Sequence, residues 1–314
     1  MSRFGRETTA EEVARAADLR GRTAVLTGAS SGLGAETARA LAIAGADLVL
    51  GVRNLAKGEA LLREVSAQAS ARLERLDLSD LASVMDFTSR IEGPVDLLIA
   101  NAGVSKTPES HLPNGLDVRF ATNHLGHFLL AHRLKPNMAR RGARLVVVSS
   151  AAHKGMKLRL DDLQWHQREY SLAAYGESKT ANILFAQEAT RRWAAEGIYA
   201  NAVLPGSVLT GLQRYHGEEM KRRIGFILPD GSINPDVKSV GQGAATTIWA
   251  ATAPELEDRG GLVLEDCAEA LPVGPDTHPW SGFDREVVDP ETARLLWEHS
   301  LELIRALVGE AWLR

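Results

Sequence analysis

Tyr175 and Lys179 are the two residues whose types and spacing most directly suggest chemistry. On a helix, residues four positions apart share one face, so the phenol and the ammonium can point into the same space. A phenol titrates near pH ~10, and lowering that pKa to about 7 requires roughly 4 kcal/mol. A solvent-exposed ion pair supplies at most about 1 kcal/mol. The pair can therefore exchange protons near neutral pH only if it is sheltered and helped by a further positive charge, such as an oxidised nicotinamide ring; on an open surface it would do no chemistry.

A glycine-rich turn lies near the N-terminus. Residues 22–27 predict a short buried strand, which runs into Gly28-Ala-Ser-Ser-Gly32-Leu-Gly34, and strong helix formers follow at 35–44. Strand, glycine turn and helix together place backbone N–H groups and a helix N-terminus against a pyrophosphate. The absence of a following Gly-Lys-Ser/Thr excludes a phosphate loop of the nucleotide-hydrolase kind. A lone glycine turn is often only a turn, but these flanks favour dinucleotide binding.

The rest of the chain alternates apolar strand-like runs with helical patterns. This alternation predicts an α/β fold, a doubly wound parallel sheet of Rossmann type with helices on both faces. We expect a single domain over residues 1–314, with 1–20 as an N-terminal extension and 207–238 as a substrate lid. Further strands are predicted at 47–52, 72–78, 95–100, 144–149, 199–204 and 261–265, and helices at 55–69, 81–91, 114–140, 174–195, 239–252 and from 289 onward.

Composition limits the function classes. The formal net charge of −4 and the lack of a dense basic block exclude nucleic acid as an expected partner. A single cysteine, Cys267, excludes a disulfide framework, and the nine histidines show no paired metal spacing, so no metal is expected. His124 and His127 are expected to pack or cap a helix. The polar first twenty residues differ from a signal peptide and no apolar run approaches a spanning length, so we expect a cytoplasmic protein without a transmembrane segment.

The chain resembles the short-chain dehydrogenase/reductase family in its motif Thr27-Gly28-x-x-x-Gly32-x-Gly34, which is followed far downstream by Tyr175-x-x-x-Lys179. The resemblance extends over residues 22 to 210 in the family's order, and it implies a nicotinamide-dependent oxidoreductase. The intermediate landmarks are Asn101-Ala-Gly103, Asn123 in Thr122-Asn-His-Leu-Gly-His-Phe128, Ser149 and Ser150 at a strand end, and Pro205-Gly-Ser-Val-Leu-Thr210.

The resemblance also implies catalytic roles. Tyr175 would be the general acid/base, and Lys179 would lower its pKa while binding the nicotinamide ribose. Ser150 would hydrogen-bond the reacting oxygen, with Ser149 completing the strand end, and Asn123 would anchor a water that passes protons to Lys179. These parts suit hydride transfer, which needs orientation, a donor to the oxygen and a proton source.

Tyr170 is a competing phenol in the same region. Its i+4 position is occupied by Ala174, which cannot supply a charge, so Tyr175 is preferred as the proton donor.

The choice of cofactor is expected at the end of the second strand, where a carboxylate would accept the ribose hydroxyls. Val52 cannot accept a hydrogen bond there, and Arg53 can clamp a 2′-phosphate unless it is an ordinary surface arginine. NADP(H) is therefore preferred, with NAD(H) as the alternative. Asp77 matches the position that contacts adenine, or it caps the helix near Ser79. The implied cofactor contacts are Gly28, Ser30, Ser31, Gly32, Leu33, Gly34, Arg53, Asn54, Asp77, Leu78, Asn101, Ala102, Gly103, Tyr175, Lys179, Pro205, Gly206, Val208 and Thr210.

The segment between Ser150 and Tyr175 is longer than in many family members. This insertion resembles the retinol-dehydrogenase-like branch, which includes WW-domain oxidoreductases, although no WW-like module occurs in this chain. The 153–169 loop and the lid are expected to form the substrate wall, which favours a small lipophilic carbonyl or alcohol such as a steroid, retinoid or aromatic ketone. The apolar lid residues are Leu209, Leu212, Tyr215, Phe226, Ile227 and Leu228.

Other functions and assemblies remain open from sequence. A cofactor-sensing regulatory protein on the same fold is disfavoured because the tyrosine and lysine are both present. A sugar-nucleotide epimerase is disfavoured by the Gly32-x-Gly34 spacing, while a pigment reductase fits the same motifs. The helices at 114–140 and 174–195 would suit a homodimer seam or the core of a monomer.

Overall fold

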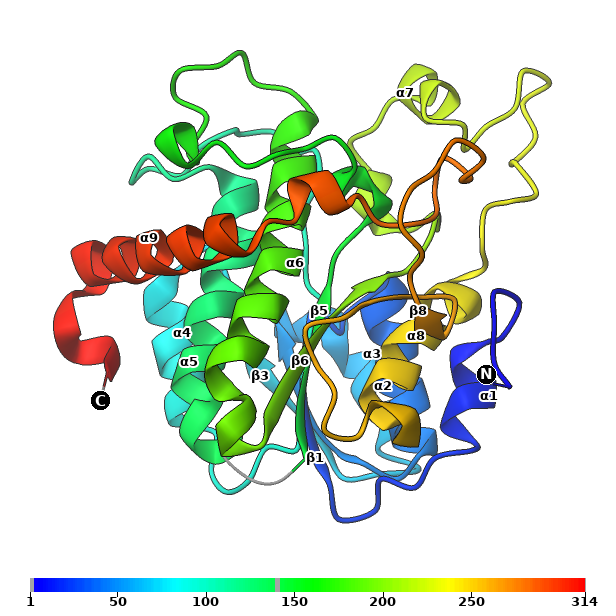
Figure 1. Ribbon diagram of the computed structural model, residues 1–314. Coiled ribbons are helices and arrows are strands. Elements are labelled where there is room, and N and C mark those ends of the chain that lie inside the picture. Colours follow the sequence, from blue (N-terminus) through cyan, green and yellow to red (C-terminus); the bar gives the residue numbers. More distant parts are fainter. Residues whose placement is uncertain (1–2, 139–141, 314) are drawn as a thin grey trace.

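Short apolar runs form the strands of one central sheet. The computed structural model describes residues 3–138 and 142–313, and its eight strands lie in the order β3-β2-β1-β4-β5-β6-β7-β8. All neighbouring pairs are parallel except β7 and β8 (Figure 1). The predicted doubly wound, mostly parallel sheet is confirmed. The strands are β1 Thr23–Thr27, β2 Asp47–Val52, β3 Ala71–Arg75, β4 Leu97–Ala100, β5 Ala143–Val148, β6 Ile198–Leu204, β7 Val263–Glu265 and β8 Ala268–Glu269.

Helices cover both faces of this sheet. On one face α2 and α8 pack together under α1, and on the other α6 packs against α9 and α5 against α4 (Figure 1). The α-helices are α1 Ala10–Ala14, α2 Gly32–Ile43, α3 Leu55–Val65, α4 Leu81–Ser89, α5 Gly126–Met138, α6 Ala173–Trp193, α7 Glu218–Arg223, α8 Val240–Thr252 and α9 Pro290–Val308. Within the described ranges, none of the helices has the length and apolar character needed to cross a membrane.

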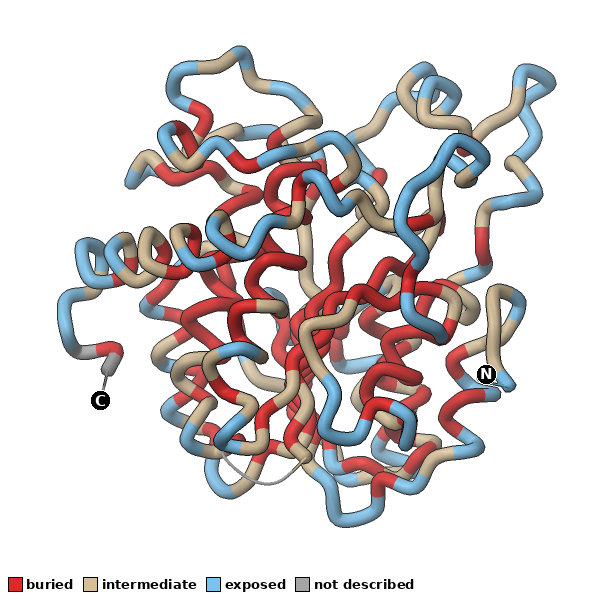
Figure 2. Tube along the Cα trace, viewed as in Figure 1, coloured by how far each residue is buried: buried red, intermediate tan, exposed pale blue. Residues whose placement is uncertain are grey.

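The two layers of helices enclose two hydrophobic cores, because side chains along a strand alternate between the faces of a sheet. In β5, Leu145 and Val147 belong to the core with α5, α6 and α9, whereas Val146 belongs to the core with α2 and α8. Buried segments accordingly follow the sheet and the inner sides of the helices (Figure 2). Strands buried on both faces read as continuous apolar runs, which explains why the sequence pattern located them.

The helix predicted over 114–140 begins later than expected. A π-helix, η1 (Phe120–Leu125), comes first and leads into α5; residues 139–141 lie outside the described part. The reason is a cap: the Asp117 carboxylate accepts hydrogen bonds from the N–H groups of Arg119 (2.9 Å) and Phe120 (2.8 Å). An aspartate in this role starts a helix, so the residues before it remain a turn.

The first residue of α5 makes a close backbone approach that positions this helix. A Cβ atom on Gly126 would lie 2.2 Å from the carbonyl oxygen of Leu78, just beyond the end of β3. Gly126 therefore lets α5 pack directly on the chain that leaves the sheet edge beside the site.

Replacing Gly126 with alanine should lower the free energy of unfolding by about 1–3 kcal/mol, because the methyl group must push backbone atoms apart. Gly217→Ala is the matched control, since its φ is −62° and no heavy atom lies within 4 Å of the added Cβ. Denaturant unfolding of the two variants measures the difference. Equal stability would show that the close approach carries no packing constraint.

Candidate active site

The carboxyl ends of β1, β4, β5 and β6 border one large cavity of about 1130 Å³. All the predicted cofactor contacts line it, and so do Ser150, Tyr175 and Lys179; Asn123 lies behind its wall. The parallel topology brings these distant segments together, because strands that run the same way end at the same edge. The cofactor contacts that line the cavity are Gly28, Ser30, Ser31, Gly32, Leu33, Gly34, Arg53, Asn54, Asp77, Leu78, Asn101, Ala102, Gly103, Pro205, Gly206, Val208 and Thr210, besides Tyr175 and Lys179.

The glycine turn at the start of α2 has the geometry of a phosphate cradle. Gly28 (φ +72°) and Gly32 (φ +55°) adopt left-handed backbone conformations that favour glycine. A Cβ on Gly34 would lie 2.2 Å from the carbonyl oxygen of Gly28, so the turn closes on itself only with glycine there. Ser31 is the N-cap of α2 but makes no side-chain cap bond. The first N–H groups of the helix thus lack a side-chain cap and are suited to an anion.

The side chain of Thr27 ties this turn to the neighbouring strand. Its hydroxyl accepts hydrogen bonds from the N–H groups of Asn101 (3.0 Å) and Ala102 (2.9 Å). It lies 2.8 Å from Nε2 of His127, to which it donates its own hydrogen, and His127 Nδ1 donates to the carbonyl of Asn123 (2.9 Å). His127 therefore does more than pack or cap a helix, since it connects β1 with η1.

Asn123 is fully buried within the π-helix η1 and uses its whole side chain. Its Nδ2 donates to the carbonyl of Val104 and to the hydroxyl of Ser178, both at 2.9 Å, and its Oδ1 accepts from the N–H of Val104 at 2.8 Å. Isolated π turns in helices are frequent at functional sites. Here the side chain fastens the loop after β4 to the residue that precedes Lys179.

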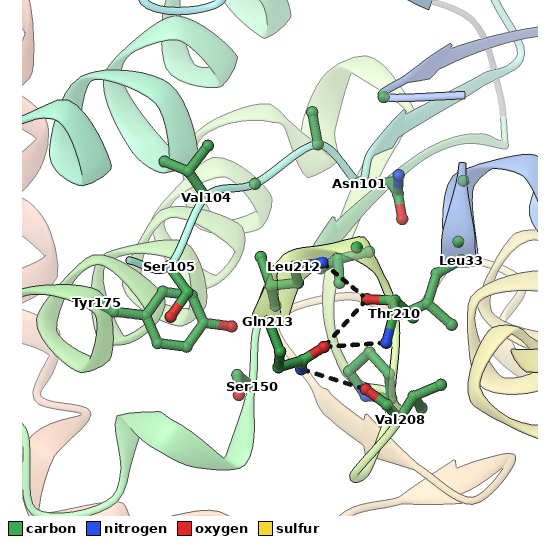
Figure 3. Close-up of a pocket in the computed structure, with 18 of the residues that line it drawn as sticks. Leu33, Asn101, Val104, Ser105, Ser150, Tyr175, Val208, Thr210, Leu212 and Gln213 are labelled. Carbon is green, nitrogen blue, oxygen red and sulfur yellow. Dashed lines mark hydrogen bonds between the residues drawn. The ribbon is translucent and has the colours of Figure 1, made fainter. Parts of the chain in front are cut away.

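Two adjacent serines at the end of β5 have different partners. The Ser149 hydroxyl donates to the carbonyl of Lys179 (2.7 Å) and is buried. The Ser150 hydroxyl accepts from the N–H of Ala152 (3.2 Å) and lies close enough to the Tyr175 phenol to lower its pKa. Figure 3 shows the Tyr175 phenol extending into the cavity that Ser150 also borders. Ser150 thus lies beside the phenol, whereas the Ser149 hydroxyl is bonded to the backbone of α6; the choice of Ser150 as the reacting serine stays a prediction.

Burial controls the protonation of Tyr175 and Lys179. It raises the pKa of Tyr175 to about 12, opposed by the hydrogen bond with Ser150, and it lowers the pKa of Lys179 to about 7. Lys179 Nζ donates to the carbonyl of Val148 (2.9 Å) and lies 5.8 Å from the centre of the Tyr175 ring. The pair is sheltered, as the sequence required, but it does not by itself produce a phenolate. A further positive charge in the cavity is needed for that.

Two cations lie at the end of the cavity next to the carboxyl ends of β2 and β3. Arg53 and Lys57 are exposed at its rim, with no acidic side chain at the end of β2; Asn54 caps α3 by accepting from the N–H of Lys57 (3.2 Å). The Asp77 carboxylate accepts from the N–H (3.0 Å) and hydroxyl (2.6 Å) of Ser79. The N-cap of α4 is Asp80, so Asp77 forms a turn at the cavity rather than capping that helix.

The other end of the cavity is bordered by the lid. Its two ends are joined, because Val208 and Lys238 form a β-bridge and the Lys238 N–H donates to the carbonyl of Ser207 (2.8 Å). Among the expected apolar lid residues, Leu212, Tyr215 and Phe226 line the cavity, whereas Leu209, Ile227 and Leu228 do not.

The 153–169 loop contributes less to this wall than the sequence suggested. Only Met156 of this loop lines the cavity. Arg168 lies over the ring of Trp165 (3.8 Å) and forms ion pairs with Asp162 and Glu177, which fasten the loop to α6.

Several cavity residues were missed from sequence. No motif marks them; the only available signal for Trp280 was an aromatic residue in a loop rich in proline and glycine. They include Lys57, Ser105, Pro279 and Trp280, and also Gln213 and His216, which lie in the predicted lid but were not singled out. Among the described residues, no group of three or more histidine, cysteine, aspartate or glutamate side chains could hold a metal ion.

Comparisons with known proteins agree with this fold. The short chain dehydrogenase family model matches residues 22–221. A Streptomyces lividans protein that carries the name "Probable oxidoreductase" is 44% identical over 92% of this chain and 99% of its own length. The human WW domain-containing oxidoreductase is 35% identical over 98% of this chain and 74% of its own length. The crystal structure of an uncharacterized protein from Mycobacterium Paratuberculosis superposes with a TM-score of 0.72 at 34% identity, covering 93% of this chain and 97% of that one.

The chain belongs to the short chain dehydrogenase family, and it is an oxidoreductase of that family. The branch resemblance seen in the sequence is confirmed by the relatives that carry the WW-domain oxidoreductase name.

Burial of Lys179 predicts a pH dependence of stability in the cofactor-free protein. The pKa falls from 10.5 to about 7 on folding, so the unfolded chain binds more protons between these values. Stability should therefore rise with pH from about 7 to 10, by up to about 1.4 kcal/mol per unit, and be lost as pH falls back. Lys179→Met should remove this slope in denaturant unfolding. Parallel pH profiles for the two proteins would contradict the shift.

Proposed function

We propose that the protein interconverts a lipophilic ketone or aldehyde and its alcohol with NADP(H). The observation that carries this proposal is the meeting of Ser150, Tyr175 and Lys179 in one cavity with an uncapped glycine turn. Both partners of a hydride transfer can be placed there, with the dinucleotide along the strand ends and the carbonyl beside the phenol.

The residues present fit a nicotinamide dinucleotide. The left-handed glycines and the uncapped start of α2 suit the pyrophosphate. Gly103 leaves room next to Lys179, since a Cβ there would lie 3.4 Å from Nζ, so a ribose can approach the ammonium. When bound, the cofactor supplies or accepts the hydride.

Tyr175 and Ser150 would act on the carbonyl oxygen. Two neighbouring hydroxyl groups that face the cavity can both donate to one substrate oxygen, which stabilises the charge developing there. Tyr175 gives up its proton in reduction and receives one in oxidation. Its raised pKa suits the donor role, and a cation close to the phenol would lower the pKa for the reverse reaction. Asn123 would fix the part of α6 that carries Lys179, through its hydrogen bond to the Ser178 hydroxyl.

The preference for NADP(H) over NAD(H) is supported by charge. Arg53 and Lys57 both border the cavity where the adenosine ribose would lie, and no carboxylate stands at the end of β2. Two cations favour a 2′-phosphate, and the arginine can bind it in a fork. Val52 is buried and lies outside the cavity wall, so the discrimination would depend on the two cations alone.

The lipophilic character of the substrate is supported by Leu212, Tyr215, Phe226 and Met156 around the phenol end of the cavity. A regulatory cofactor sensor would not need Ser150, Tyr175 and Lys179 to border the same cavity. Assays of purified protein with NADPH in the dark, against steroids, retinoids and aryl ketones, would separate a carbonyl reductase from a sensor and from a light-driven pigment reductase.

Tyr175→Phe should lower kcat by about 10²–10⁴-fold, because it removes the proton donor, while NADPH affinity changes little. Steady-state reduction of an aryl ketone and NADPH titration measure both quantities. Tyr170→Phe is the matched control: its hydroxyl has no hydrogen-bond partner among the described residues and lies outside the cavity. Equal turnover by the Tyr175→Phe variant and the wild type would refute the assignment.

Removing both cations, as Arg53→Ala with Lys57→Ala, should weaken NADPH binding by about 10–100-fold and leave NADH binding nearly unchanged. Arg63→Ala on the same helix, outside the cavity, is the control. Dissociation constants for both cofactors give the answer. If wild-type protein binds NADH more tightly than NADPH, the proposed preference is wrong.

A further inference from the structure

A segment close to the C-terminus, residues 278–284, lies across the phenol end of the cavity, and we name it the strap. In Figure 1 the loop that precedes α9 passes close to the lid helix α7. Pro279 and Trp280 of the strap line the cavity. We propose that the strap is a fixed wall of the substrate site, and that Trp280 sets the largest carbonyl substituent that can bind. This inference rests on the proposed function for its substrate class.

The strap is fastened to the turn that follows Ser150. His153, fully buried, donates from Nδ1 to the carbonyl of Ser150 (2.6 Å) and accepts at Nε2 from the N–H of Asp284 (3.0 Å). One imidazole therefore connects the backbone of the proposed reacting-oxygen donor with the backbone of the strap. The Asp284 carboxylate also accepts from the N–H of Gly155 (2.9 Å).

Lys154 holds the middle of the strap. Its ammonium donates to the carbonyls of Pro279 (2.5 Å) and Ser281 (2.9 Å), with that of His278 at 3.5 Å. Three backbone carbonyls converge on one cation, an arrangement that satisfies polar groups in a segment without secondary structure. The N–H of Gly282 adds a bond to the Glu265 carboxylate (2.7 Å), so the strap is also tied to β7.

Trp280 joins this fixed wall to the lid. Its ring meets Phe226 edge-on, with ring centres 5.4 Å apart, and its Nε1 donates to the carbonyl of Ile224 (3.2 Å). A Cβ on Gly225 would lie 3.0 Å from the Trp280 ring, so a glycine between these two lid residues permits the contact. The two aromatic rings close the cavity at this point. Because the strap is fastened, the indole ring cannot move aside for a bulky substituent.

The positions of the fastening residues make the wall part of the reaction geometry. His153 and Lys154 follow Ser150 by three and four residues. The distance between the proposed oxygen-binding hydroxyl and the aromatic wall is therefore set by a short, hydrogen-bonded turn rather than by the lid. A substituent that fits between the Ser150 hydroxyl and the Trp280 ring is accepted, and one that exceeds this space is excluded.

The test compares NADPH-dependent reduction of acetophenone and 4-phenylacetophenone, expressed as the ratio of kcat/KM for the large ketone to that for the small one. Trp280→Ala should raise this ratio by about tenfold or more, a range typical of changes in an apolar pocket. Trp280→Phe keeps most of the wall and should change the ratio much less. Lys154→Met frees the strap and should move the ratio in the same direction as Trp280→Ala. Lys157→Met, an exposed lysine in the same loop and outside the cavity, is its matched control.

An unchanged ratio in both Trp280→Ala and Lys154→Met, with melting temperatures that show folded protein, would overturn the wall assignment. The dissociation constants of the two ketones, measured calorimetrically with NADP⁺ present, give a second readout that needs no turnover. A shifted ratio of dissociation constants without reduction of either ketone would retain the wall and refute the proposed function for these substrates. Failure of every variant to bind either ketone would count against both.

Discussion

The hydroxyl group of Thr27 is the contact on which the arrangement of the site depends. It accepts two N–H groups from the end of β4 and donates to His127, whose other nitrogen donates to Asn123. The glycine turn, the loop after β4 and the π-helix are therefore positioned relative to one another by one buried side chain. Such a fully satisfied network is rigid, because any displacement leaves a buried polar group without a partner. The surfaces proposed for the cofactor and for the proton donor consequently form one unit.

Electrostatics in this unit are dominated by burial. Lys179 and Tyr175 are both disfavoured in their charged forms when the cavity contains only protein. A charged ligand that enters such a site would shift the pKa values of both groups strongly, because the low dielectric strengthens electrostatic interactions inside the cavity. The protein thus supplies shelter and hydrogen bonds, and the charge that would adjust the phenol comes from whatever binds beside it.

The proposed selectivity would come from irregular segments at the far end of the cavity, away from the reacting groups. The two ends of the lid are held together by the β-bridge between Val208 and Lys238. The strap is held to the turn after Ser150 by hydrogen bonds of His153 and Lys154. Loops fastened at defined points can vary in sequence while the sheet and α6, which position the reacting groups, stay the same.

The sequence by itself determined the fold class, the positions of the strands β1 to β7 along the chain and the predicted cofactor contacts that meet in the cavity. Strands buried on both faces are continuous apolar runs, glycines mark left-handed turns, and a tyrosine and a lysine four apart share a helix face; all of these signals are local. Only the tertiary structure decided which remote side chains complete the site. Asp117 caps a helix that begins later than the predicted 114–140, and His127 bonds to Thr27 of β1. Arg168 fastens the 153–169 loop to α6, and Trp280 lines the cavity. His127 and Trp280 have partners far away in the chain, and Arg168 lies in a loop without periodicity, so no local pattern could reveal these contacts. The Asp117 cap is local, because the N–H groups that it binds lie two and three residues further on, but the apolar pattern over 114–140 does not register it.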